Sequence, residues 1–123
     1  METIKSNAEI SKIFKEGKKS SNKYITVIIF PKNLEKLSLD ADFEHGLNGR
    51  VAFIAGRKNG NACWRNRAKR RLRELTKQFN GPWSGYDVLL VAKHSLTEAN
   101  YSKVSSTIKN TLQELGLVEP GAE

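Results

Sequence analysis

The chain has 123 residues, a length at which one domain buries roughly two-thirds of its unfolded surface without needing a disulfide or a metal. Its 21 Lys and Arg against 13 Asp and Glu give a net charge of +8, and its one cysteine excludes an intrachain disulfide framework. No apolar run reaches the roughly 18 residues of a membrane helix or resembles a signal-peptide core, so we expect a cytoplasmic protein without a membrane partner.

The first predicted element is a short helix over residues 6–17. Ser6 and Glu9 form the S-x-x-E pattern of a capping box, and Gly17 is a typical helix stop. Between them, apolar residues recur at helical spacing, at Ile10, Ile13 and Phe14. Residues 18–23 are polar and predict a connection. The sequence YITVIIF at residues 24–30 is β-branched and continuous, which predicts a largely buried strand that ends at Pro31.

Two further strands and a terminal helix are predicted in the second half of the chain. Residues 32–49 predict a loop, in which Leu34, Leu37 and Leu39 are compatible with a small edge strand. Residues 50–56 and 86–92 predict strands, and because a helical segment lies between them we expect parallel pairing. Spacings of three and four predict a final amphipathic helix on the sheet, with an inner face of Tyr101, Val104, Ile108, Leu112 and Leu115. Gly116 ends it, so we expect one domain over residues 1–116 and a frayed tail over residues 117–123.

The positive charge is concentrated in one segment. Residues 45–73 hold nine Lys or Arg and no acid, which leaves 12 Lys or Arg and 13 Asp or Glu for the rest of the chain. Apolar residues recur there at intervals of three and four, which predicts a helix with the inner stripe Trp64, Ala68, Leu72, Leu75 and Phe79. Cations spaced four residues apart fill the remaining faces as an outward ridge.

A glycine-containing turn at residues 56–61 precedes this basic helix. It carries two cations and a candidate helix cap at Asn59 or Asn61. Its amide groups and the helix N-terminus suit a phosphate, but the turn lacks the Walker pattern G-x-x-x-x-G-K-[ST]. The turn and the helix together are therefore a candidate surface for a polyphosphate.

Three interpretations of the basic helix can be compared. A solvated polar face normally mixes charges of both signs, because like charges four residues apart destabilise a helix by a few tenths of a kcal/mol per pair. A membrane-surface helix would use its apolar stripe on lipid, whereas Trp64, Leu72 and Phe79 are better used in covering a sheet. A nucleic-acid partner offsets the repulsion among the cations, and we favour it.

The sequence offers no catalytic constellation or metal site. His45 and His94 lie in unrelated loops and are predicted to be surface residues, and Cys63 beside Trp64 is predicted to pack. Residues 40–44 hint at a calcium loop, but Val51 stands where the bidentate Glu belongs. We therefore expect no metal or cofactor bound by protein groups.

Residues 65–74, RNRAKRRLRE, resemble the "RNR" signature of the protein component of bacterial ribonuclease P. The resemblance extends to residues 57–62 (RKNGNA), 13–17 (IFKEG) and 86–92 (YDVLLVA), in the order of that family. It covers most of the chain, from about residue 4 to residue 116.

The resemblance implies a subunit that binds a catalytic RNA and assists removal of 5′ leaders from precursor transfer RNA, with the chemistry and its Mg²⁺ on the RNA. It implies no obligate protein partner. The residues implied to bind the RNA subunit are Arg57, Lys58, Arg65, Asn66, Arg67, Lys69, Arg70 and Arg73. A cleft between the first helix, the sheet and the basic helix is implied to hold the leader, with contacts from Phe14, Tyr24 and Ile28.

The resemblance also implies the fold: an α/β (α+β) two-layer sandwich with a central mixed sheet of three to four strands and about three helices. The strand–basic helix–strand crossover of this family is left-handed, whereas the general rule for such connections predicts a right-handed one. The alternative function is a ribosome-associated or other RNA- or DNA-binding module without an enzyme partner, because a cation-rich helix suits a DNA major groove about as well.

Overall fold

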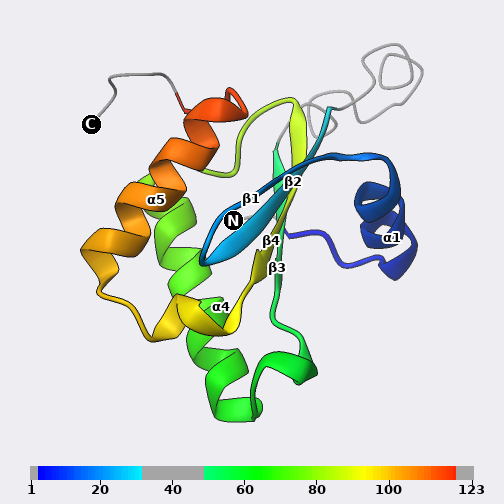
Figure 1. Cartoon of the computed structure of the whole chain (residues 1–123). Helices are drawn as coiled ribbons and strands as arrows, with labels where there is room; N and C mark the ends of the chain where they lie inside the picture. Colours follow the sequence, from blue (N-terminus) through cyan, green and yellow to red (C-terminus); the bar gives the residue numbers. More distant parts are fainter. Residues whose placement is uncertain (1–2, 32–48, 119–123) are drawn as a thin grey trace, which may run out of the picture.

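The computed structural model describes residues 3–31 and 49–118, and within them three α-helices and a four-stranded mixed sheet. The elements are α1 (Asn7–Glu16), β1 (Lys18–Ser21), β2 (Ile25–Pro31), β3 (Arg50–Ile54), the 3-10 turn η1 (Arg57–Asn59), α4 (Ala62–Gln78), β4 (Tyr86–Ala92), the 3-10 turn η2 (His94–Thr97) and α5 (Tyr101–Glu114). The strand order is β1-β2-β4-β3. The predicted α+β fold class is confirmed (Figure 1).

Local sequence signals set the ends of the helices. The hydroxyl oxygen of Ser6 accepts a hydrogen bond from the Glu9 amide at 3.3 Å, and the side-chain oxygen of Asn61 accepts one from the Trp64 amide at 2.9 Å. Of the two predicted caps for the basic helix, Asn61 is therefore the right one. Gly17 follows α1 because a Cβ there would lie 2.6 Å from the Ile13 carbonyl oxygen.

Strand β1 was not predicted, and the expectation of a plain polar connection over residues 18–23 is wrong. Residues Lys18–Ser21 pair antiparallel with β2, with Lys19 opposite Ile28. This strand lies at the edge of the sheet and has largely exposed, polar side chains. A polar edge strand lacks the apolar pattern by which strands are recognised in a sequence, and its charges discourage pairing with other chains.

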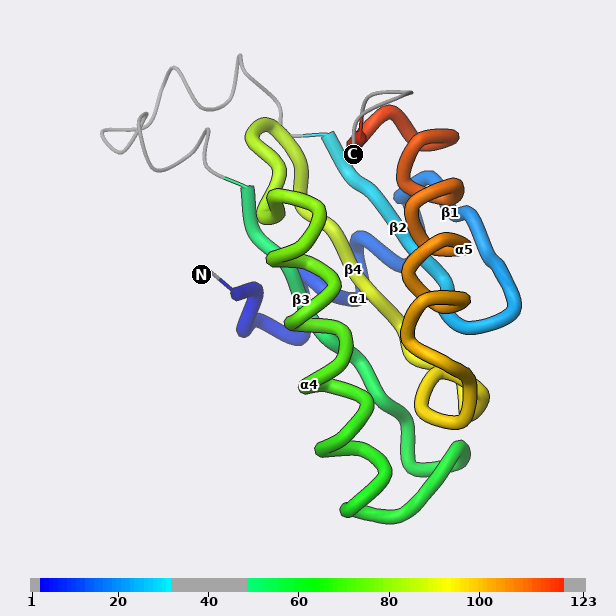
Figure 2. Tube along the Cα trace, turned by 90° about the vertical axis from the view of Figure 1, so that its left-hand side faces the viewer, coloured from blue at the N-terminus to red at the C-terminus, as the bar shows by residue number. Residues whose placement is uncertain are grey.

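The β3–α4–β4 connection is left-handed. The predicted parallel pairing is confirmed, with Val51 opposite Val88. In Figure 2, α4 lies in front of the sheet, both strands run downward and β4 lies to the right of β3. The general preference for right-handed crossovers thus gives the wrong answer here, and the resemblance gives the right one.

Helices occupy both faces of the sheet. On one face, α4 and α5 pack on a core that includes Val27, Val51 and Val88. On the opposite face, Ile13 of α1 packs on a smaller core with Ile28 and Leu89. Alternate residues of β2 therefore enter different cores, which explains why its sequence is apolar apart from Thr26.

The chain is ordered slightly beyond the predicted end of the domain. Gly116 has a φ of +81°, and the Leu117 amide donates to the Leu112 carbonyl at 3.0 Å, which is a Schellman-type helix end. Leu117 and Val118 pack against the larger core. Residues 119–123, the predicted loop from residue 32 to residue 48 with its candidate edge strand at residues 34–39, the 40–44 segment and His45 lie outside the described residues. No helix among the described residues is both long and apolar enough to span a membrane.

Candidate nucleic-acid interface

The basic helix has the predicted division between an inner and an outer face. Its inner stripe is buried at Trp64, Ala68, Leu72 and Leu75, and half-buried at Phe79. The predicted RNA-binding side chains of α4 are exposed at Asn66, Arg67, Lys69, Arg70 and Arg73, and half-buried at Arg65. The apolar stripe fixes the rotation of α4 on the sheet, and the cations consequently form one surface.

Two arginines on the flanks of α4 contact aromatic rings. The guanidinium of Arg73 lies 5.7 Å from the ring centroid of Phe53, and that of Arg71 lies 5.5 Å from the ring centroid of Tyr101. Arg71 Nη1 also donates to the carbonyl oxygens of Leu96 at 2.9 Å and Ala99 at 3.0 Å. Arg71 thus joins α4 to the segment between β4 and α5, a structural role that charge patterning alone does not reveal.

The turn before α4 extends the basic surface. Arg57 and Lys58 lie in η1 and are exposed, beside Asn59. Gly60 packs directly on Trp64, since a Cβ at Gly60 would lie 2.7 Å from the indole ring. The turn is therefore held close to the first turn of α4, and its cations adjoin those of the helix.

His94 is exposed, as predicted, but it does not stand alone. Its Nδ1 lies 2.6 Å from the Asn59 carbonyl oxygen, and its Nε2 lies 2.7 Å from the Glu98 carboxylate. The hydrogen bond to Asn59, followed by the negative charge of Glu98, raises the pKa of His94 above its ordinary value of 6.5. These partners lie 35 positions before and 4 positions after His94 in the chain, so only the Glu98 spacing could have been noticed in the sequence.

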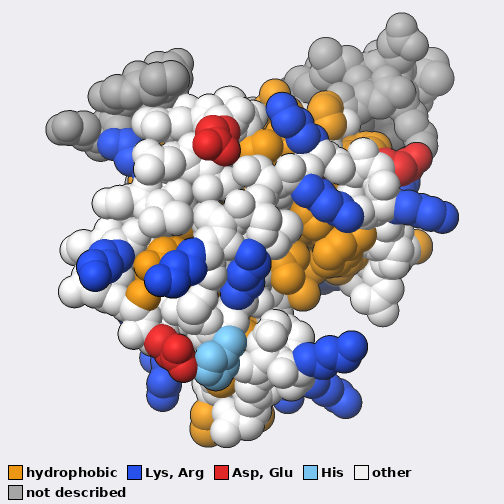
Figure 3. Space-filling view, in the orientation of Figure 1, with side chains coloured by type: hydrophobic (Ala, Val, Ile, Leu, Met, Phe, Trp, Pro, Cys, Tyr) orange, Lys and Arg blue, Asp and Glu red, His pale blue; other side chains and the backbone are white. Residues whose placement is uncertain are grey.

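A half-exposed apolar strip lies on the α1 side of the sheet. It consists of Ile10, Phe14, Phe30, Ile54 and Val91, which pack around the smaller core. Figure 3 shows hydrophobic side chains exposed beside α1, with Lys and Arg side chains around them. Ile54 pairs with Val91, and only two residues separate it from η1, so the strip approaches the basic turn at one end of the sheet.

The three predicted leader-binding residues do not share one surface. Phe14 is half-buried beside Ile28, but Ile28 itself is only 1% exposed and forms the floor of the strip. Tyr24 is 6% exposed and belongs to the core on the opposite face, under α4 and α5. The expectation that Tyr24 lies with Phe14 is therefore wrong, because Tyr24 precedes the regular part of β2 and does not follow its alternation.

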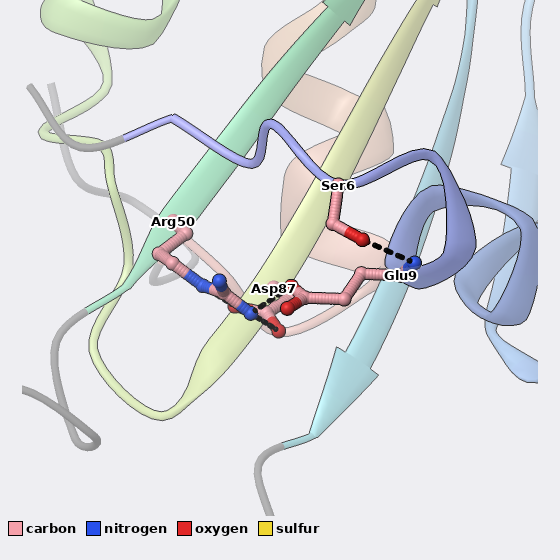
Figure 4. Close-up of polar contacts among 4 residues, drawn as sticks. All are labelled: Ser6, Glu9, Arg50 and Asp87. Carbon is pink, nitrogen blue, oxygen red and sulfur yellow. Dashed lines mark hydrogen bonds and ion pairs between the residues drawn. The ribbon is translucent and has the colours of Figure 1, made fainter.

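An ion-pair network fixes α1 on this face of the sheet (Figure 4). Arg50 donates to both carboxylate oxygens of Asp87, from Nε at 3.1 Å and from Nη2 at 2.8 Å. Arg50 Nη2 also lies 2.7 Å from the carboxylate of Glu9 in α1. The hydrogen bond to Asp87 outweighs burial and raises the pKa of Arg50, so the guanidinium stays charged. The network joins β3 and β4 to α1, the helix that contributes Ile10 and Phe14 to the apolar strip.

Comparison with known proteins gives a consistent result. The family model described as Ribonuclease P matches residues 1–116. The ribonuclease P protein component of Natranaerobius thermophilus is 35% identical over 104 residues, which cover 82% of this chain and 78% of that protein. That of Alkaliphilus oremlandii is 28% identical over 117 residues, covering 94% of this chain and 91% of that protein.

Solved structures show the same fold. The RNase P protein of Staphylococcus aureus superposes with a TM-score of 0.75 at 21% identity, covering 97% of this chain and 99% of that one. The RNase P protein of Thermotoga maritima gives a TM-score of 0.71 at 24% identity, covering 93% of this chain and 97% of that one.

Proposed function

The chain belongs to the family of ribonuclease P protein components, and on this basis we propose that it binds the catalytic RNA of that enzyme and promotes removal of 5′ leaders from precursor transfer RNA. The RNA carries the hydrolytic chemistry and holds the Mg²⁺ that it needs. The protein contributes binding energy and orientation, and it acts in the cytoplasm.

The observation that carries this proposal is the positively charged surface of η1 and of α4 as far as Arg73. From Gly56 to Arg73 the chain has no acidic residue, and the predicted RNA-binding side chains there are exposed apart from the half-buried Arg65. Arginine guanidinium groups match phosphate oxygens with two parallel hydrogen bonds and also stack on unpaired bases. We assign the contacts with the RNA subunit to Arg57, Lys58, Arg65, Asn66, Arg67, Lys69, Arg70 and Arg73.

We assign the single-stranded leader to the apolar strip beside α1. Apolar and aromatic side chains bind unpaired nucleotides by stacking, and nearby cations hold the phosphates between them. Phe14 contributes a half-buried ring to the strip, and the buried side chain of Ile28 lies in the core against which the strip packs. Lys12 lies 5.5 Å from the ring centroid of Phe30, which places a cation at the edge of the strip. Tyr24 has no part in this site because it faces the other core.

The proposal is tested by reconstitution with a ribonuclease P RNA at low Mg²⁺ concentration, followed by an assay of precursor cleavage. We expect the protein to raise cleavage well above that by the RNA alone, and a variant with Arg67 and Arg70 both changed to Ala to raise it much less. A protein that leaves cleavage unchanged, and that recovers ribosomal RNA or DNA from cell extract instead of one dominant structured RNA, would support the non-enzymatic alternative.

A further inference from the structure

His94 connects three segments that are separate in the chain. Its side chain contacts the carbonyl oxygen of Asn59 in η1 and the carboxylate of Glu98 after η2. Its ring stacks on that of Trp64 in α4, with centroids 5.9 Å apart and planes inclined by 21°. Its own carbonyl oxygen accepts a hydrogen bond from the indole N–H of Trp64 at 3.3 Å. The basic turn, the start of the basic helix and η2 therefore meet at one imidazole.

The segment around His94 is itself anchored to the sheet. The ammonium of Lys93 donates to the Ser21 hydroxyl at 2.7 Å and to the Asn22 carbonyl. The hydroxyl of Ser95 donates to the Lys23 carbonyl at 2.7 Å. Because its neighbours on both sides are fixed to the β1–β2 hairpin, His94 is held in place and can act as a support for a less constrained segment.

The contact with His94 adds to the hydrogen bonding within the turn itself. Within η1, the Asn59 amide donates to the Gly56 carbonyl at 3.2 Å, the upper end of the usual range for an N–H···O hydrogen bond. The Asn59 carbonyl points outward to His94. A carbonyl oxygen can only accept, so the contact exists only when Nδ1 carries a proton. His94 is thus the donor that holds the outer side of the turn bearing Arg57 and Lys58.

We propose that His94 is a positioning residue for RNA binding: by donating from Nδ1 to the Asn59 carbonyl, it holds η1 in the orientation that presents Arg57 and Lys58 to the phosphates of the RNA subunit. This inference rests on the proposed function of the turn. A turn that is already ordered in the free protein loses less conformational entropy when it binds.

Protonation of His94 strengthens this support. The imidazolium donates to Asn59 and Glu98 at once, whereas neutral imidazole has one N–H and faces one of the two acceptors with a lone pair. Glu98 favours the proton, whereas the charged residues next to His94 and Asn59 in the chain, Lys93, Arg57 and Lys58, are cationic. The support is accordingly complete below pH 6.5, the ordinary pKa, and weakens as the pH rises through the raised pKa of folded His94.

Two variants separate hydrogen-bond donation from ring stacking. His94→Asn keeps an N–H donor near the position of Nδ1 but removes the ring. His94→Phe keeps a ring on Trp64 but removes the donor. Affinity for a ribonuclease P RNA is measured for both and for wild type, at about pH 6 and about pH 9 and at constant salt. A double variant with Arg57 and Lys58 changed to Ala reports what the turn itself contributes.

We expect the Phe variant to bind about two- to fivefold more weakly than wild type at the lower pH, which is the size of one net hydrogen bond. At the lower pH, the affinity of the Asn variant for the RNA should be close to that of wild type. The Asn variant should lack the part of the pH dependence that protonation of His94 causes in wild type. Equal affinities for wild type and the Phe variant, or equal losses in the two variants, would overturn the inference.

A measurement without RNA distinguishes this inference from the proposed function. Amide hydrogen exchange at Asn59 and Trp64, whose N–H groups donate to the Gly56 carbonyl and to the Asn61 side chain, should be faster in the Phe variant than in wild type when followed by NMR in the free protein. Unchanged exchange shows that His94 does not order the turn, whatever the RNA does. Faster exchange together with full affinity in the Arg57 and Lys58 double variant would instead show that the turn is ordered by His94 but does not bind the RNA.

Discussion

At the scale of single residues, the cations of α4 fall into two groups that the sequence does not separate. Arg67 and Arg70 are exposed and face away from the core, whereas Arg71 is half-buried and donates to the carbonyl oxygens of Leu96 and Ala99. The first group is available to phosphates. Arg71 instead has a structural role, because its guanidinium already donates to two carbonyl oxygens and lies over the ring of Tyr101.

This difference predicts that alanine at position 71 mainly lowers stability, whereas alanine at position 70 mainly weakens RNA binding. Arg71→Ala should lower the free energy of unfolding by about 1–2 kcal/mol, because it removes two charge-assisted hydrogen bonds and the ring contact. Arg70→Ala should change it by less than about 0.5 kcal/mol but reduce the salt dependence of RNA binding by about 0.7–0.9 in log–log slope. Urea unfolding and binding at several salt concentrations measure the two quantities. A stable Arg70 variant with an unchanged slope would argue against α4 as the RNA surface.

Phe14 tests the leader site. Ile10 and Ile13 also anchor α1, so Phe14→Leu should retain the fold and the affinity for the RNA subunit. Loss of the stacking ring should cost about 1–3 kcal/mol per stacked base and reduce the preference of the assembled enzyme for precursor over mature transfer RNA. Competition between the two RNAs measures this preference. If it survives the substitution, or if the variant unfolds, Phe14 is a core residue.

At the scale of elements, an ion-pair network joins α1 to the sheet in addition to the apolar face of the helix. The ion pair between Arg50 and Asp87 lies against the sheet, with side-chain exposures of 26% and 11%, and the more exposed Glu9 extends it to α1. The partly buried pair therefore stabilises the junction of β3 with β4, while the Glu9 contact links this pair to α1.

Two substitutions separate these contributions. Arg50→Met keeps the aliphatic stem but leaves the Asp87 carboxylate without its guanidinium, and it should lower the free energy of unfolding by about 2–3 kcal/mol. Glu9→Gln should lower it by less than about 1 kcal/mol, because an exposed ion pair is weak. Thermal unfolding compares the two variants with wild type. Similar small losses in both would mean that the pair with Asp87 contributes no more than a surface contact.

At the scale of the whole molecule, two surfaces meet at one end of the sheet. The basic surface of η1 and α4 begins just after β3, and the apolar strip ends at Ile54 of the same strand. A long RNA bound along α4 and a single strand in the strip would therefore approach each other near the turn. The arrangement suits a protein that joins a catalytic RNA to the leader of its substrate.

The assembled enzyme rather than the protein should therefore be the active species. We expect purified protein to leave precursor transfer RNA uncut under conditions in which the reconstituted complex removes the leader. The assay needs protein shown to be free of contaminating nucleases and of bound RNA. Cleavage by such a preparation, abolished by changing one protein side chain, would place catalysis on the protein and refute the proposal.

Local patterns in the sequence determined a large part of this structure. Strand β4, the last helix and the inner stripe of α4 follow from runs and spacings of apolar residues, because each element must bury one face. The basic surface follows as well, since the stripe leaves the cations only the outer face. Ser6 caps the first helix as expected, and Asn61 is one of the two residues expected to cap α4, because a cap depends on neighbours within one helical turn.

Only the tertiary structure decided the features that depend on distant neighbours. The polar strand β1 forms because its backbone pairs with that of β2. Tyr24 faces the larger core because it precedes the residues of β2 that alternate between the two faces of the sheet. The contacts of Arg71 and His94 join positions 25 to 35 residues apart. The left-handed crossover also depends on distant neighbours, because the side of β3 on which the later strand β4 lies decides its handedness. No local pattern encodes such contacts, because their energy arises only when separate elements are packed together.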